Sequence, residues 1–147
     1  MENQKFIVFK LDQEFYAIPV RLVQSIERIQ SITRVPNTKS FVKGIMNLRG
    51  IITPVIDLRE RLKLNAKAED DHTRVIIAHL QDDSTGLIVD EANDVIEIDE
   101  SNIKPTPETF DQVQMDYITG VIKDEDRLIV LLDLNQIFNS ELVQLVE

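Results

Sequence analysis

The sequence predicts a mainly β fold made from two copies of one small β unit. Three observations support this prediction: apolar runs of strand length, short polar turns between them, and an apolar pattern that repeats along the chain. The 147 residues are within the usual range for one domain, and the hydrophobic content of 43% is enough for a core. We therefore expect residues 1–147 to form a single domain.

The predicted strands are rich in Val and Ile, which favour β structure. Polar turns such as Asp12–Glu14 and Asp82–Ser84 separate them. This spacing is typical of small antiparallel sheets or barrels and not of βαβ units. The predicted strands are Lys5–Leu11, Phe15–Val20, Gly44–Arg49, Ile51–Asp57, Arg74–Leu80, Gly86–Asp90 and Arg127–Asp133.

Helical signals are short. One turn is expected at Asp57–Leu62, and an amphipathic C-terminal helix is expected from Asp133 through Leu145. In that last segment the apolar residues at helical spacing are Leu134, Ile137, Phe138 and Leu142. The segment Asp99–Tyr117 contains two prolines and little periodicity, so it should be an extended crossover and not a central strand.

The apolar pattern repeats at two offsets. At an offset of 69 the matched pairs are Ile7 with Ile76, Leu11 with Leu80, Ile18 with Leu87, Val20 with Val89, Ile26 with Val95, and Ile29 with Ile98. At an offset of 76 they include Gly44 with Gly120, Ile52 with Leu128, Asp57 with Asp133, and Leu58 with Leu134. The paired Gly and the repeated Asp-Leu indicate duplication of one β unit.

Composition excludes several classes of function. The chain has no cysteine, which removes disulfides and zinc-thiolate sites, and its net charge of −10 disfavours nucleic acid as a partner. Residues 1–74 hold 13 Lys and Arg against 9 Asp and Glu, whereas residues 75–147 hold 3 against 17. The sharper interpretation is that the two halves face different partners, and the simpler one is a solvated surface of varying composition. Without an apolar signal region or a membrane-length apolar run, we expect a cytoplasmic protein with no membrane insertion.

No constellation that carries catalysis is recognisable. The chain lacks a Gly-rich nucleotide loop, and its acidic clusters lack the ligand spacing of a calcium loop, so we expect no catalytic residue, metal or cofactor. His72 and His79 have no ligand partner at helical or strand spacing, which favours ordinary surface or half-buried histidines. The alternative from another class is a small β-barrel enzyme that uses Asp and Glu as acid and base.

The repeat provides an internal control for function, because what folding requires should be present in both copies. Opposite Asn47-Leu48-Arg49-Gly50 in the first copy stands Lys123-Asp124-Glu125-Asp126 in the second. The β unit therefore does not require Arg49. Gly50 allows a left-handed backbone, and Arg49 offers a planar fork of donors to a carboxylate on a partner. The structural alternative is a salt bridge within the chain.

The segments Gly44–Gly50 and Thr53–Arg59 resemble the signature of CheW-like domains. The resemblance extends over nearly the whole chain, through Phe6–Phe9, Val23–Ile26 and Thr33–Pro36. It implies two intertwined five-stranded β-barrel subdomains, here near 5–64 and 73–138, with a strand exchanged or shared between them. It also implies a bacterial chemotaxis adaptor that binds the cytoplasmic tip of a chemoreceptor and the regulatory domain of the histidine kinase CheA, and that is recruited to receptor arrays at the inner face of the membrane.

Carried over by position, the resemblance implies a receptor-facing surface that includes Val23, Ile26 and Arg49, with Gly44 shaping the strand beside it. The resemblance also implies a Glu at the position of Ser25, as in many relatives, where it could pair with the equivalent of Arg49. This chain has Glu27 two residues on, which lies on the same face of a strand and is the candidate supporting partner of Arg49. CheW-like domains also occur in CheA and in CheV, and the length favours a stand-alone adaptor over a CheV-type protein.

Overall fold

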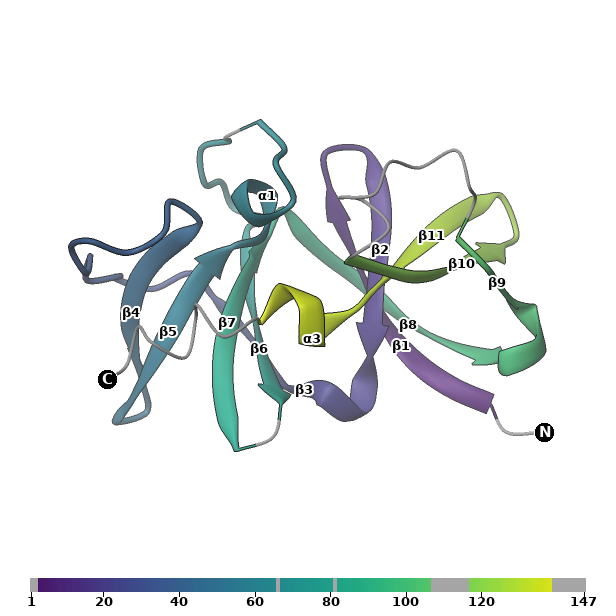
Figure 1. Ribbon diagram of the computed structural model, residues 1–147, viewed down its shortest axis with the longest axis horizontal. Helices are drawn as coiled ribbons and strands as arrows, with labels where there is room; N and C mark the ends of the chain where they lie inside the picture. Colours follow the sequence, from purple (N-terminus) through teal and green to yellow (C-terminus); the bar gives the residue numbers. More distant parts are fainter. Residues whose placement is uncertain (1–2, 66, 81, 107–116, 139–147) are drawn as a thin grey trace.

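The structure, a computed structural model of the chain, describes residues 3–65, 67–80, 82–106 and 117–138 (Figure 1). Most of these residues are in strands, so the predicted mainly β class is confirmed. The strands are β1 Asn3–Leu11, β2 Glu14–Pro19, β3 Val23–Arg28, β4 Val42–Leu48, β5 Ile51–Asp57, β6 Arg74–Leu80, β7 Asp83–Val89, β8 Glu91–Asp99, β9 Ile103–Lys104, β10 Ile118–Asp124 and β11 Arg127–Leu132. The helical segments are η1 Val20–Leu22, α1 Leu58–Arg61, η2 Glu100–Asn102 and α3 Leu134–Ile137.

The strands form two sheets that lie side by side along the long axis of the molecule (Figure 1). Sheet A has the order β8-β1-β2-β11-β10-β9, and sheet B has the order β3-β6-β7-β5-β4. Neighbouring strands are antiparallel except for β2 with β11 and β5 with β7, which are parallel. Sheet A exceeds the five strands that the resemblance implies because β9 adds two residues at the edge of β10.

The two sheets have the same arrangement. An offset of 69 carries β1, β2 and β3 onto β6, β7 and β8, and an offset of 76 carries β4, β5 and α1 onto β10, β11 and α3. Under these offsets the order of sheet B reproduces the first five strands of sheet A. The register repeats as well, since Val55 pairs with Gly86 in sheet B and Leu131 with Ala17 in sheet A. The predicted duplication is therefore visible in the topology.

Each sheet contains strands from both copies. The β1–β2 hairpin lies in sheet A with β8, β10 and β11, and the β6–β7 hairpin lies in sheet B with β3, β4 and β5. Two strands of each copy, and not one, thus lie in the sheet formed by the other copy's remaining strands. Each sheet contains strands from both of the segments 5–64 and 73–138. These limits therefore describe the two repeated segments of the sequence, and as limits of subdomains they stay a prediction.

The central hairpins are apolar on both faces, as expected of strands covered on both sides. Phe6 and Val8 of β1 point into a core inside sheet A, whereas Ile7 and Phe9 point into a core between the two sheets. β6 repeats the pattern in sheet B: alternate residues point into a core inside that sheet and into the core between the two sheets, which is called the shared core below. The described residues therefore form three apolar cores, of which the one between the sheets is the largest.

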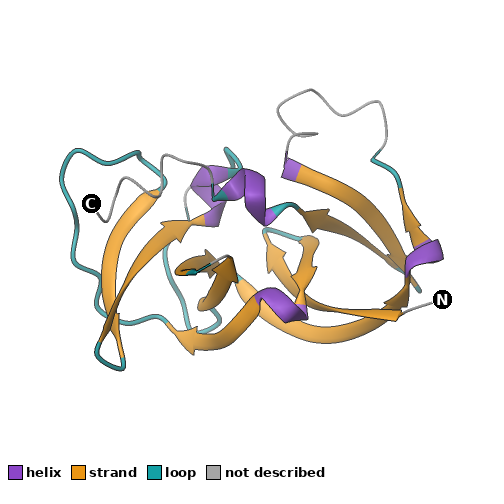
Figure 2. Ribbon diagram, turned by 60° about the horizontal axis from the view of Figure 1, so that its bottom comes forward, coloured by secondary structure: helices purple, strands orange, loops and turns teal. Residues whose placement is uncertain are grey.

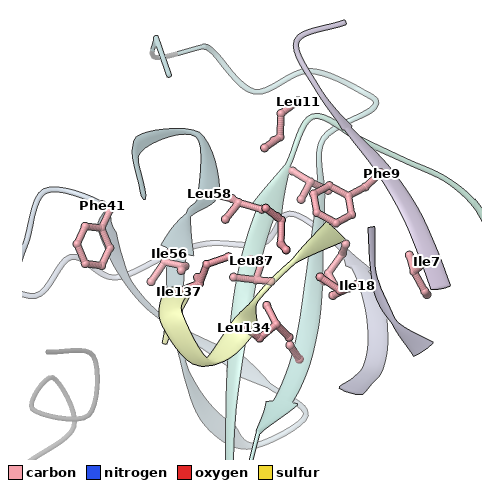
Figure 3. Close-up of a cluster of buried hydrophobic side chains, with 14 of the residues drawn as sticks. Ile7, Phe9, Leu11, Ile18, Phe41, Ile56, Leu58, Leu87, Leu134 and Ile137 are labelled. Atoms are coloured by element: carbon pink, nitrogen blue, oxygen red, sulfur yellow. The ribbon is translucent and has the colours of Figure 1, made fainter. Parts of the chain in front are cut away.

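Both short helices begin at a capping aspartate. The Asp57 carboxylate accepts the Arg59 N–H at the start of α1, and Asp133 accepts the Asn135 N–H at the start of α3. Figure 3 shows α3 over the shared core, with Leu134 and Ile137 among its side chains. The rest of the predicted C-terminal helix, through Leu142 and Leu145, lies outside the described residues. Over the described part of the chain, no helix has the length and apolar character needed to cross a membrane.

Candidate functional site

The β4–β5 hairpin turn holds the predicted motif Asn47–Gly50. Arg49 and Gly50 both have positive φ, 52° and 88°, which is the backbone of a two-residue type I′ turn. The Asn47 side-chain oxygen accepts the Gly50 N–H at 2.7 Å and stabilises the turn. Glu125, at the equivalent position of the β10–β11 turn, has a φ of 55°. Both turns therefore have a positive φ at their first residue, which is Arg49 in one copy and Glu125 in the other; at the second residue φ is positive at Gly50 and not at Asp126.

Arg49 and Glu27 form an ion pair. Arg49 Nη2 lies 3.0 Å from Glu27 Oε2, with the Arg49 side chain 69% exposed and the Glu27 side chain 14% exposed. Glu27 is on β3 and Arg49 follows β4, and these strands are the two edges of sheet B. The ion pair thus joins the edges of a curled sheet, which Figure 2 shows as strongly curved strands.

β3 presents alternating faces, with Val23, Ser25 and Glu27 half-buried and the residues between them exposed. Val23 packs against the core between the sheets, and Ile26 on the other face is 40% exposed. Of the two apolar residues predicted to bind a receptor, Ile26 is therefore the one available at the surface. The Ser25 hydroxyl is buried and has no hydrogen-bond partner among the described residues.

Gly44 is buried beneath a chain crossing. Its φ is 143°, and a Cβ built on it would lie 2.0 Å from the Thr33 carbonyl oxygen. Thr33 and Ile45 exchange backbone hydrogen bonds of 2.8 and 2.9 Å across this point. Gly44 hence supports the hairpin from below and does not contribute to an exposed surface. Gly120 is its equivalent in β10, where the Lys104 oxygen of β9 lies close.

Two exposed isoleucines follow the Arg49 turn. Ile51 is 63% exposed and Ile52 is 65% exposed, values unusual for large apolar side chains in a folded chain. Sequence reasoning placed both in a strand but did not single them out. The Ile51–Asp57 run is almost continuously apolar, so alternation did not show which of its residues faces solvent.

The second copy has a corresponding surface at the other end of the molecule. Its exposed apolar residues are Val95 and Leu128, which are the equivalents of Ile26 and Ile52. Figure 1 shows the β4–β5 turn at the lower left and the β10–β11 turn at the upper right. Among the described residues, the segment 20–90 that contains sheet B holds 11 Lys and Arg against 9 Asp and Glu, whereas the segments 3–19, 91–106 and 117–138 that contain sheet A hold 5 against 11. The two ends thus resemble each other in shape and differ in charge.

Arg127, on the interior strand β11 of sheet A, is linked to the edge strand β8 and to the neighbouring strand β10. It pairs with Asp94 on β8 at 3.1 Å and with Asp124 at 2.7 Å, and its guanidinium lies 5.0 Å from the centre of the Phe15 ring. Hydrogen bonds from Arg127 to Asp94 and Asp124 raise the pKa of this arginine. Its side chain is 25% exposed, so Arg127 is largely enclosed by its own sheet.

A pocket of about 350 Å³ lies beside α1, and two of its carboxylates, Asp57 and Asp90, are paired with cations. Arg59 contacts Asp90 at 2.6 Å and Asp12 at 2.7 Å, while Asp57 lies 3.7 Å from Lys43. Burial lowers the pKa of Arg59, but Asp12 and Asp90 outweigh that effect and raise it. The acid-base enzyme alternative needs two convergent carboxylates that exchange a proton, and these groups serve as ion-pair partners instead. Across the residues that the structure describes, no cluster of His, Asp and Glu fits a metal ion.

A family model described as the CheW-like domain matches residues 5–142. The chain belongs to the CheW-like family. The CheW proteins of this family are non-catalytic scaffold proteins of chemotaxis, so the chain is an adaptor of that type, and the predicted resemblance is confirmed.

Relatives cover nearly the whole chain. Chemotaxis protein CheW from Bacillus subtilis is 44% identical over 139 residues, which are 95% of this chain and 89% of that protein. Chemotaxis protein CheW from Klebsiella aerogenes is 35% identical over 99% of this chain and 87% of its own. The crystal structure of the scaffolding protein TtCheW from Thermoanaerobacter tengcongensis matches with a TM-score of 0.86 and 35% identity over 94% of both chains. Chemotaxis protein CheV3 from Helicobacter pylori is 27% identical over 85% of this chain and 41% of that protein.

Proposed function

We propose that the chain couples chemoreceptors to the histidine kinase CheA by binding the receptor's cytoplasmic tip and the kinase's regulatory domain. The observation that carries this proposal is the contrast between the two copies at the Arg49 turn. Both turns have a positive φ at their first residue, yet that residue is an exposed arginine only in the first copy. The higher identity to CheW of B. subtilis than to CheV3 of H. pylori favours the adaptor role over a CheV-type role.

The receptor-binding surface proposed here is centred on Arg49 and Ile26. Glu27 holds the Arg49 side chain with one oxygen and leaves 69% of that side chain open to solvent. A partner carboxylate can accept from the guanidinium nitrogens that Glu27 does not use, because arginine presents five donors in a planar fork. Val23 and Gly44 take part indirectly, as a half-buried support and as the crossing point beneath the hairpin.

The test is charge reversal at Arg49. Arg49→Glu should weaken binding of a receptor-tip fragment by about 2 kcal/mol, or roughly 30-fold in Kd, because a carboxylate replaces the cation at a partly desolvated contact. Binding of the CheA regulatory domain should persist. Glu125→Arg is the matched control, since it reverses the charge at the equivalent turn position with the same sign of φ, and it should leave receptor binding unchanged.

A double variant separates contact from support. Glu27→Arg with Arg49→Glu restores an ion pair between the two positions but keeps the reversed charge in the exposed turn. If Arg49 contacts the receptor, the double variant should bind the tip as weakly as Arg49→Glu alone. Full recovery would mean that only the ion pair matters. Equal weakening toward the receptor tip and the kinase domain would contradict the separation of the two partner surfaces.

A further inference from the structure

Arg61 is a buried cation between two aromatic rings. Its side chain comes from α1, the residue is 9% exposed, and its guanidinium carbon lies 4.6 Å from the centre of the Phe41 ring and 4.9 Å from that of Tyr117. Phe41 precedes β4 and Tyr117 precedes β10, so the rings occupy equivalent positions in the two copies. Arg61 therefore lies where the two copies meet.

The guanidinium donates its hydrogen bonds to the second copy. Nη1 donates to the Tyr117 hydroxyl at 2.8 Å, Nη2 to the Gln136 carbonyl at 3.1 Å, and Nε to the Ile137 carbonyl at 3.2 Å. The two carbonyls belong to the last turn of α3, where backbone acceptors lack helical partners. Within the described ranges, no carboxylate lies within ion-pair distance of Arg61. Rings and carbonyls thus hold a charge that proteins usually pair with an anion when it is buried.

The repeat shows that folding of the β unit does not require this cation. At the offset of 76, the position of Arg61 in α1 corresponds to Ile137 in α3, which is fully buried in the core between the sheets. In the second copy, an apolar side chain fills the equivalent position. The cation in the first copy consequently adds something beyond core packing, and its bonds connect the end of α3 to α1.

We infer that Arg61 is a positioning residue that sets the angle between sheet A and sheet B. The core between the sheets resists separation, but hydrophobic contact is not directional. The hydrogen bonds of a planar guanidinium are directional, and a rotation of one sheet against the other would break them. This part of the inference rests on the proposed function: the angle between the sheets also determines the relative orientation of a receptor tip and a kinase domain bound at the two ends of the molecule.

The test measures the angle directly. Because the chain has no native cysteine, spin labels can be attached at Lys5→Cys on β1 and Arg28→Cys on β3, which are exposed positions in different sheets. In Arg61→Met the distance distribution between the labels should shift or broaden relative to the parent. Arg127→Met is the control, since Arg127 also combines a ring contact with hydrogen bonds but within sheet A alone, and its distribution should match the parent.

A parent-like distribution in Arg61→Met, or the same broadening in Arg127→Met, overturns the inference. If Arg61→Met does not fold, Arg61→Lys replaces it, because lysine keeps the charge and loses the planar fork, and a parent-like distribution there overturns it equally. In binding assays, Arg61→Met should retain its affinity for the receptor tip and for the kinase domain alone and lose the complex that contains both. Failure of the unmodified chain to bind either partner would remove the proposed function, while the label distances would still decide the role of Arg61.

Discussion

Two arginines show how the surroundings of one side chain decide its role. Arg127 is surrounded by two carboxylates and a ring, whereas Arg49 has Glu27 as its carboxylate partner and extends into solvent. An enclosed guanidinium with its donors in use contributes to the rigidity of its own sheet. An exposed one with donors to spare can bind another molecule. The same residue type in equivalent regions of the repeat thus has a structural role at one end and a proposed binding role at the other.

The ionisation of Tyr16 should make the free energy of unfolding depend on pH in the alkaline range. Burial, followed by the charges of Glu14 and Asp12, raises the pKa of Tyr16 from 10.0 to about 12. The folded state therefore holds the phenolic proton more tightly than the unfolded state. Stability from this group is complete below pH 10.0 and is lost as the pH rises toward about 12.

Tyr16→Phe should remove this alkaline loss, because phenylalanine keeps the ring that stacks on Phe9 and has no proton to release. The measurement is the free energy of unfolding by urea at several pH values from just below 10.0 up to about 12, for the parent and the variant. The difference between the two should change with pH. Parallel curves over the whole interval would contradict the assigned titration.

The sequence alone identified Arg49 because turn residues have local signatures and the repeat supplied a comparison. Glu27 was a candidate partner of Arg49 because the resemblance implies a Glu at the position of Ser25, and two residues along a strand return to the same face; the structure contains this ion pair. The sequence alone did not find Ile51 and Ile52 as exposed residues, nor Arg61 as a link between the copies. Exposure and contact partners of these residues depend on which strands lie beside them, and that is decided by the tertiary arrangement.

At the scale of the element, the β4–β5 hairpin contains two glycines with positive φ and very different surroundings. Gly44 is buried under the Thr33 carbonyl, whereas a Cβ added at Gly50 would meet no atom within 4 Å. Gly44→Ala should destabilise the protein by roughly 3 kcal/mol or more, because it adds a backbone clash to an unfavourable φ. Gly50→Ala should cost about 1 kcal/mol, from φ alone.

Denaturant unfolding of the two glycine variants measures the difference. Gly50→Ala is the control for the effect of φ, as both positions lie in the same hairpin. Similar losses of stability in the two variants would contradict the prediction. They would show that the backbone at Thr33 can move to accommodate the added Cβ at little cost in free energy.

Several elements were missed or displaced in the prediction, for reasons that the structure makes plain. β3 and β8 are edge strands in which no residue is fully buried, so neither forms the continuous apolar run that marked the other strands. β10 was not predicted as a strand, although the offset of 76 matches it to β4. Within the predicted crossover Asp99–Tyr117, the described residues include η2 and β9, and β9 lies at the edge of sheet A; residues 107–116 lie outside the described residues.

For the whole molecule, the connections between strands explain why the hairpins are exchanged. One residue, Asp90, separates β7 from β8, and η1 alone separates β2 from β3. In an unexchanged unit, β8 would have to pair with β6 on the side away from β7, which puts it about 10 Å from β7 across two strand spacings. A single residue spans at most about 7 Å between its neighbours' Cα atoms. The chain therefore continues from β7 directly into the other sheet. The repeat in the sequence did not by itself reveal this constraint from the short connection.

Separated halves provide the test at this scale. Each of the halves 1–68 and 69–147 contains only one hairpin of one sheet and the remaining strands of the other sheet. Because neither half can complete a sheet, neither should unfold cooperatively by itself. Mixed together, they should form a complex with a near-parental circular dichroism spectrum and a cooperative transition. Cooperative unfolding of either half alone would mean that a hairpin can return to its own copy.

The exchange of hairpins also sets an order of events at the ribosome. Sheet B is built from residues 23–89, so its strands can all pair before synthesis of the chain is finished. Sheet A unites β1 and β2, the first strands to emerge, with β8 through β11, which emerge last. The β1–β2 hairpin must therefore wait with its apolar faces incompletely covered while the whole of sheet B is translated. Its exposure to chaperones and to neighbouring nascent chains is greatest in that interval, which makes the N-terminal hairpin the segment most prone to misassembly during biosynthesis.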